Sequence, residues 1–196
     1  MPFEMIHFRD SDKILKRKHL VKDVQVTLQY LDDALYGMLY RGEILRQALS
    51  EMGWREKDTL NILDGRRYAY KGFKKDVAIE GSFAAYEFIL EGLLRLQIGF
   101  DKKKIEMGIL MLTSHRSEKS SYGTSADLAK VEVEMLFPTI SVPVTIALFD
   151  LGKPIDLEEG GGDEVNGSVP VPPDDQWKDQ QVEAQSTGTG EGVSPG

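Results

Sequence analysis

Cysteine is absent from the sequence, which excludes disulfide bonds and thiolate metal sites. No apolar run reaches the ~20 residues that a helix needs to cross a bilayer. The three histidines, His7, His19 and His115, are too scattered for a zinc motif. The glycine run at 160–162 does not join a strand to a helix, as a phosphate-binding loop would. Since the first residues also lack a signal-peptide pattern, we expect a cytoplasmic protein without membrane contact.

Acidic and basic residues are distributed unevenly along the chain. The net charge is −8, but the segment from Leu151 to Gly196 alone holds ten acidic and two basic residues. Residues 1–150 therefore hold 22 of each kind. A neutral domain with local basic clusters is compatible with nucleic-acid binding, which a uniformly acidic surface would disfavour. Each basic cluster taken alone is also typical of an ordinary solvated helix or turn.

The same shift in composition predicts the domain organisation. Residues 1–157 have the apolar content of a single domain, and residues 158–196 are rich in Gly, Pro, Ser and acidic residues. The second segment has too few large apolar side chains to offset the entropy of ordering it. We expect one folded domain over 1–157 and a disordered acidic tail over 158–196.

Hydrophobic periodicity predicts the elements of the domain. Apolar residues at three- and four-residue steps predict four helices: Val21–Leu39, Glu43–Met52, Ala84–Ile98 and Ala126–Leu136. Gly53 and Gly99 are expected to end the second and third of these. Alternating or continuous apolar runs predict five strands: Thr59–Leu63, Arg67–Phe73, Val77–Phe83, Ile105–Leu112 and Val144–Leu148. A tight turn at Lys75-Asp76 would join two of them. This order predicts an α/β fold with a mixed central sheet flanked by helices.

Several segments carry a resemblance to a known family. The stretch YKGFKKDVAIEGS, from Tyr70 to Ser82, resembles the metal-site hairpin of restriction endonucleases of the BglII and BamHI type, which belong to the PD-(D/E)XK nuclease superfamily. Residues 104–113 resemble the next core strand of that family, and residues 120–149 resemble the helix and strand that follow. The resemblance implies a restriction-endonuclease-like fold over about residues 40–150.

The resemblance also implies a metal site on the hairpin. The family places an Asp on the first strand, a Glu nine residues later, and a third polar group two positions beyond the Glu. Here Glu80 matches the Glu, but Lys71 stands at the Asp position and Ser82 at the third. These three residues are the candidate catalytic groups. An ammonium at Lys71 is expected to pair with Glu80 and to repel a cation.

An active site of this family would use Mg²⁺, which binds through one or two carboxylates and keeps several waters. Glu80 would then be one metal ligand. Two other carboxylates could replace the missing Asp: Asp64, which precedes the hairpin, and Glu87, on the following helix. Glu87 and its neighbour Glu91 also fit an ordinary solvent-facing helix surface.

The partner implied by the resemblance is double-stranded DNA. The candidate DNA-binding residues are the exposed basic groups near the hairpin and after the third predicted helix: Arg66, Arg67, Lys74, Lys75, Lys102, Lys103 and Lys104. A homodimer is expected, with its contact on helix Val21–Leu39 or on helix Ala126–Leu136, because a two-fold assembly matches a palindromic site.

Two functions therefore remain open from the sequence. The first is a metal-dependent endonuclease of the type II restriction class, attenuated at its active site. The second is a pseudonuclease that binds DNA or a protein partner without cleaving. The family pattern favours the first, and the residues Lys71 and Ser82 favour the second.

Overall fold

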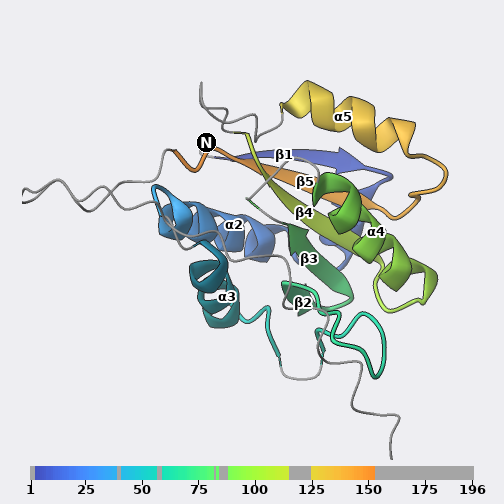
Figure 1. Cartoon of the computed structure of the whole chain (residues 1–196), viewed down its shortest axis with the longest axis horizontal. Coiled ribbons are helices and arrows are strands. Elements are labelled where there is room, and N and C mark those ends of the chain that lie inside the picture. The colour runs from blue at the N-terminus through green and yellow to red at the C-terminus, as the bar shows by residue number, and fades with distance from the viewer. Residues whose placement is uncertain are drawn as a thin grey trace, which may run out of the picture. The chain divides into compact units, whose positions relative to one another are not determined.

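The computed structural model describes residues 3–38, 41–56, 59–81, 83, 88–114 and 125–152. Ten elements lie within them (Figure 1). In chain order they are β1 (Phe3–Phe8), α1 (Ser11–Arg17), α2 (Val21–Leu35), α3 (Arg41–Glu51), β2 (Gly72–Lys74), β3 (Val77–Gly81), α4 (Phe88–Asp101), β4 (Met107–Thr113), α5 (Ala126–Met135) and β5 (Val144–Phe149). The acidic tail expected over 158–196 lies outside the described residues. No helix in the described part of the chain is long and apolar enough to span a membrane.

The strands form one mixed five-stranded sheet in the order β1-β5-β4-β3-β2. The three central strands are parallel, and the two edge strands pair antiparallel with their neighbours. Every residue of β3, β4 and β5 is buried, as expected for strands covered on both faces. The predicted α/β architecture with a mixed central sheet is confirmed.

Helices cover both faces of this sheet (Figure 1). One face packs against α4 and α5, through side chains such as Leu93, Leu96 and Val133. The other face packs against α1, α2 and α3, through side chains such as Leu15, Leu28 and Leu49. The predicted helices are present with shifted ends. The first stops at Leu35 rather than Leu39, because Gly37 turns the chain with a φ of 69°.

Two predictions about the central segment were wrong. Residues 59–63 form turns, with one isolated bridge from Asn61 to Ala69, and not a strand. Of the stretch Arg67–Phe73, only Gly72 and Phe73 fall in β2. By contrast, the turn at Lys75-Asp76 is present, with positive φ angles of 48° and 61° at its two residues. Both angles suit a two-residue hairpin turn of the type that matches strand twist.

Gly99 was also misassigned as a helix end, because α4 continues through it to Asp101. The packing shows why glycine stands inside this helix. A Cβ atom at position 99 would lie only 1.7 Å from the hydroxyl oxygen of Tyr70. Glycine is needed here for the close approach of a buried tyrosine.

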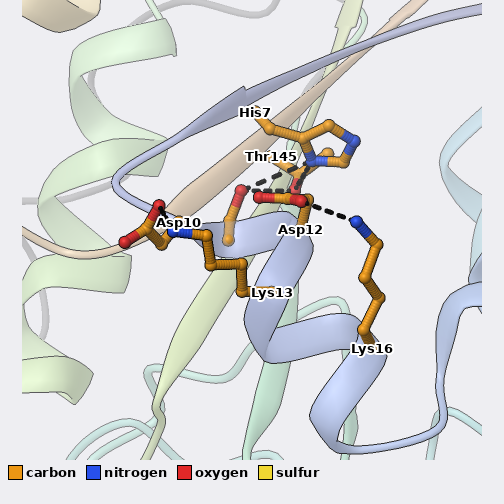
Figure 2. A network of polar contacts seen from close by, with 7 residues as sticks. His7, Asp10, Asp12, Lys13, Lys16 and Thr145 are labelled. Atoms are coloured by element: carbon orange, nitrogen blue, oxygen red, sulfur yellow. Dashed lines mark hydrogen bonds and ion pairs between the residues drawn. The ribbon is translucent and has the colours of Figure 1, made fainter.

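The sequence analysis did not predict β1 and α1. Strand β1 is an edge strand, and α1 has only seven residues with two buried among them. A polar network fastens both to β5 (Figure 2). Nδ1 of His7 lies 2.9 Å from the hydroxyl of Thr145, which donates to Ser11, and the Ser11 hydroxyl donates to the carbonyl of Val144. Since Ser11 and Thr145 are fully buried, this network satisfies hydroxyl groups that would otherwise be costly to bury.

Candidate functional site

The β2–β3 hairpin sets the position of Glu80. Gly72 pairs with Ile79 and Lys74 with Val77, so the hairpin register is fixed by the turn between them. Side chains alternate along β3, and Ala78 belongs to the core on the α4 side of the sheet. Glu80, two residues further, therefore faces the same side. It is only 2% exposed.

An arginine of α4 meets this buried carboxylate. Nε of Arg95 lies 3.0 Å from Oε1 of Glu80. The same guanidinium donates through Nη2 to the backbone carbonyl of Ala69, and Nη1 lies 3.7 Å from Glu91 one helical turn away. Burial raises the pKa of Glu80, and the charge and hydrogen bond of Arg95 oppose that rise. The geometry is that of a partly buried ion pair, with a buried carboxylate and a guanidinium that is 24% exposed, which joins β3, α4 and the segment before β2.

Tyr70 closes the same region beside Glu80. Its ring is 2% exposed, and its hydroxyl is buried without a hydrogen-bond partner. Burial, together with the negative charge of Glu80, raises the pKa of Tyr70 to about 12. The phenol therefore stays protonated and cannot serve as a base near neutral pH.

The predicted site residues fall in different environments. Lys71 precedes β2 and continues the hairpin register opposite Glu80, but its side chain is exposed. Burial raises the pKa of Glu80, and the charge of Lys71, like that of Arg95, partly opposes this rise. The expected ion pair between the two is not formed, because Arg95 takes that place from the helix above. Ser82 and Glu87 lie outside the described residues.

Asp64, the other candidate metal ligand, is committed elsewhere. Its side chain is 91% exposed and pairs with Lys104 at 2.5 Å. This contact lowers the pKa of Asp64 below its usual value. The structure therefore uses Asp64 to join the loop before the hairpin to the turn after α4.

The described residues do not fit a magnesium ion at Glu80. Mg²⁺ needs free carboxylate oxygens and room for its waters. Glu80 is enclosed and already holds a guanidinium, and the adjacent register position carries the cation Lys71. In the described part of the chain, no three His, Cys, Asp or Glu side chains are grouped so that they could hold a metal ion.

The candidate DNA-binding residues divide into two groups. Two form ion pairs: Lys104 with Asp64, and Lys74 with Asp23 at 2.8 Å. The remaining five are exposed, and none of them has an ion pair with another described residue: Arg66, Arg67, Lys75, Lys102 and Lys103. Their loops are joined by the Asp64–Lys104 contact and by the amide of Glu106, which donates to the carbonyl of Asp76. The five residues therefore gather around the amino-terminal ends of β3 and β4.

Arg95 is the functional residue that sequence reasoning missed. Its signal was present, because it lies four residues after Glu91 on a strongly apolar helix. An arginine on the sheet-facing side of such a helix needs a buried counter-charge, and Glu80 is the buried acid of the adjacent strand.

Comparisons with known proteins identify the fold. No family model and no curated protein matches the chain. Among solved structures, it is similar to restriction endonuclease BglII complexed with a DNA 16-mer, with a TM-score of 0.58 and 17% identity over 76% of this chain and 77% of that one. It is also similar to free BglII, with a TM-score of 0.52 and 16% identity over 76% and 79% of the two chains. The fold is therefore BglII-like, and the expected restriction-endonuclease-like fold is confirmed.

Proposed function

We propose that this chain binds double-stranded DNA and does not cleave it through Glu80. The observation that carries the proposal is the Glu80–Arg95 ion pair, which occupies the hairpin carboxylate inside the interface between sheet and helix. The DNA part is supported by the similarity to a restriction endonuclease solved with DNA. Fold alone does not determine activity, so the residues of the site decide between nuclease and pseudonuclease.

The chemistry of phosphodiester hydrolysis explains why this pair matters. A divalent cation polarises the phosphate and lowers the pKa of the attacking water. A guanidinium can hold a phosphate, but it does not activate a water in this way. A cation that entered the site would have to displace Arg95 and would lie beside Lys71. Metal binding would therefore have to offset the lost Arg95–Glu80 contact and the repulsion from Lys71.

The DNA-binding surface that we propose is the group of five exposed cations at the amino-terminal ends of β3 and β4, which have no ion pair with another described residue. Phosphate contacts of this kind supply sequence-independent affinity that falls steeply with added salt. The basic cluster of α1 is less suited, because Lys16 pairs with Asp12, and Arg17 and Lys18 both contact Glu106.

We further propose a homodimer that forms through α5. Val131 and Met135 on this helix are 57% and 79% exposed, and Phe137 just after it is 56% exposed. Large apolar side chains grouped in this way favour an interface with another protein surface. The alternative helix, α2, is less suited, since its exposed Tyr30 donates to Glu51 of α3. Light scattering tests this: Met135→Lys should turn a dimer into a monomer, and a wild-type monomer at high micromolar concentration would refute the interface.

Plasmid nicking and DNA binding test the main proposal together. With Mg²⁺ or Mn²⁺, the wild type should leave supercoiled plasmid intact and bind duplex DNA with a salt-dependent affinity. Arg66→Gln should weaken binding similarly for all sequences and reduce the salt slope by about one. Lys13→Gln, an exposed cation on α1, is the matched control and should bind as the wild type does.

Three results would contradict the proposal in different ways. Cleavage by the wild type that Glu80→Ala abolishes would identify a working nuclease at this hairpin. Cleavage that survives Glu80→Ala would show a nuclease site elsewhere in the chain. Absence of salt-dependent DNA binding would refute the proposal that the chain binds double-stranded DNA.

A further inference from the structure

A second arginine site lies next to the Glu80–Arg95 pair and has the opposite electrostatic character. It is a pocket of about 230 Å³ between α3 and the segment that leads into the hairpin. The residues that line it include three cationic ones, Arg46, Arg55 and Lys71, and the apolar Leu45, Leu49 and Ala69. None of the described residues that line it is acidic.

The three cations have little compensation within the described residues. Among the described residues, the side chain of Arg55 donates a hydrogen bond to the backbone carbonyl of Lys71 alone, so most of its donors have no partner there. Arg46 has one contact, at 3.7 Å, to the exposed Glu43 on its own helix. Lys71 makes no ion pair. Partial burial, together with the nearby charge of Arg46, lowers the pKa of Arg55.

This arrangement costs free energy in the absence of an anion. Arg46 is close enough to Arg55 to contribute to its lowered pKa, although solvent screens part of this repulsion because the Arg46 side chain is 65% exposed. An anion in the pocket would remove that repulsion and accept hydrogen bonds from the free donors. Guanidinium groups are especially suited to phosphate, because their planar fork can donate two parallel bonds to its oxygens.

We propose that the pocket formed by Arg46, Arg55 and Lys71 binds a phosphate group of a nucleic acid. Its volume lies below the ~300–1,000 Å³ of pockets that hold whole ligands, so it suits one phosphate with part of its sugar. The apolar Leu45, Leu49 and Ala69 would contact that sugar. The choice of nucleic acid as the source rests on the proposed function, but phosphate binding itself does not.

Inorganic phosphate is the first probe, because it tests the pocket without DNA. Thermal unfolding of the full chain is measured in sodium phosphate and in sodium chloride of equal ionic strength. Phosphate should raise the Tm of the wild type, since a ligand that binds the folded state stabilises it. Arg55→Gln should weaken phosphate binding about ten-fold, as expected for a lost charge-assisted hydrogen bond.

Arg46→Gln keeps the test decisive if Arg55→Gln folds poorly. The Arg46 side chain is 65% exposed, so its replacement should leave the fold intact. It should reduce the response to phosphate and slightly raise the Tm in chloride, because it relieves the repulsion. The matched control Lys13→Gln should respond as the wild type does. Equal Tm values in phosphate and chloride for the wild type, or an unchanged response in Arg46→Gln, would overturn the proposal.

Oligonucleotides then distinguish the two sources of a phosphate. If the pocket takes a terminal phosphate, a 5′-phosphorylated duplex should bind more tightly than the same duplex with a 5′-hydroxyl, and Arg46→Gln should abolish the difference. If it takes a backbone phosphate, the two duplexes should bind equally, and Arg46→Gln should reduce the salt slope by about one. A phosphate response without any DNA binding would leave the pocket in place and refute only the proposed function. Wild-type DNA affinity and salt slope in Arg46→Gln would show that no nucleic-acid phosphate uses it.

Discussion

Two arginines lie on either side of one short backbone segment, and their surroundings differ. Arg95 donates to the carbonyl of Ala69, and Arg55 donates to the carbonyl of Lys71. Arg95 also has the carboxylate of Glu80 at 3.0 Å in an enclosed position. Arg55 instead has a second arginine beside it and an open pocket in front. Arg95 thus occupies the carboxylate at its site, whereas Arg55 keeps donors that a ligand could use.

The difference shows that the presence of a counter-charge, more than burial or a backbone hydrogen bond, decides whether an arginine remains available to bind a ligand. A compensated guanidinium acts as part of the core and blocks the carboxylate that a metal would need. An uncompensated one keeps donors available, and its repulsion of a like neighbour favours the anion-bound state. The following predictions change one side of this comparison at a time.

The largest effect is expected from Arg95→Met. It leaves the Glu80 carboxylate buried without its partner, which costs about 3–5 kcal/mol of unfolding free energy. Losing Arg95 should raise the pKa of Glu80 further, since Arg95 opposes the effect of burial. A carboxyl whose folded pKa lies above its unfolded value destabilises the fold as pH rises through the folded pKa. The loss should therefore be largest near pH 7 and smaller near pH 4, as measured by urea unfolding.

The double variant Glu80→Leu/Arg95→Met is the control for that experiment. Replacement of both partners by apolar side chains is often neutral or stabilising. It should recover most of the lost stability at pH 7 and remove the extra pH dependence. If Arg95→Met unfolds at the same urea concentration as the wild type, the ion pair does not close the site in solution.

A smaller loss of stability is expected from Gly99→Ala, which changes the packing around Tyr70 beside the Glu80–Arg95 pair. The new methyl group would overlap the hydroxyl of Tyr70, and overpacking of this kind costs typically about 1–3 kcal/mol. Tyr70→Phe removes the overlapping hydroxyl, whose oxygen has no partner, so it should restore part of the stability when combined with Gly99→Ala. Equal stability of Gly99→Ala and wild type by thermal unfolding would contradict this packing.

Lys71→Asp replaces one cation of the Arg46–Arg55–Lys71 pocket by a carboxylate. It should change the free energy of unfolding little, since exposed charges contribute about 0–1 kcal/mol. The new carboxylate would oppose phosphate in the pocket and face Glu80 across the hairpin. The Tm increase in phosphate should disappear, and Mg²⁺ should still not raise the Tm, because Arg95 remains paired with Glu80 in this variant. Lys71→Gln separates the loss of the cation from the gain of a carboxylate, because it only removes the cation. A variant that still responds to phosphate as the wild type does would exclude Lys71 from the pocket.

The smallest effect concerns His7, far from both arginines in the sequence. Partial burial lowers the pKa of His7 below 6.5, although Asp12 acts in the opposite direction. Because the unfolded chain binds the proton more readily, the contribution of His7 to stability is present above pH 6.5 and is lost as pH falls through the folded pKa. His7→Gln should flatten this part of the stability curve between pH 7.5 and 5. An unchanged slope would exclude His7 as its source.

The parts of the site that were predictable depend on short-range sequence patterns. The hairpin turn at Lys75-Asp76 follows from the local sequence of a few residues. The partner of Glu80 does not, because Arg95 reaches it from a helix whose rotation is set by packing across the sheet. The sequence of that helix is apolar at both Leu93 and Leu94, but Leu93 is buried and Leu94 is 50% exposed. Periodicity thus placed the helix without settling which residues face inward.

For the fold as well, sequence patterns located the long elements but not their exact ends or partners. Long apolar runs identified β4 and β5, since strands buried on both faces read as continuous hydrophobic segments. The short segments were harder. Gly99 was taken for a helix end because an isolated glycine usually is one, and only the approach of Tyr70 gives it another role. The edge strand β1 was missed because its stability comes from pairing with β5 at the far end of the domain.

That pairing has a consequence for synthesis on the ribosome. Phe3 lies opposite Phe149, so the first of the described strands in chain order pairs with the last of them. Until β5 emerges, β1 has no neighbour in the sheet, and the edge of β4 that β5 later covers stays exposed. Closing so long a loop is slow, and exposed strand edges favour aggregation in the meantime. The described sheet can therefore be completed only after β5 has left the exit tunnel.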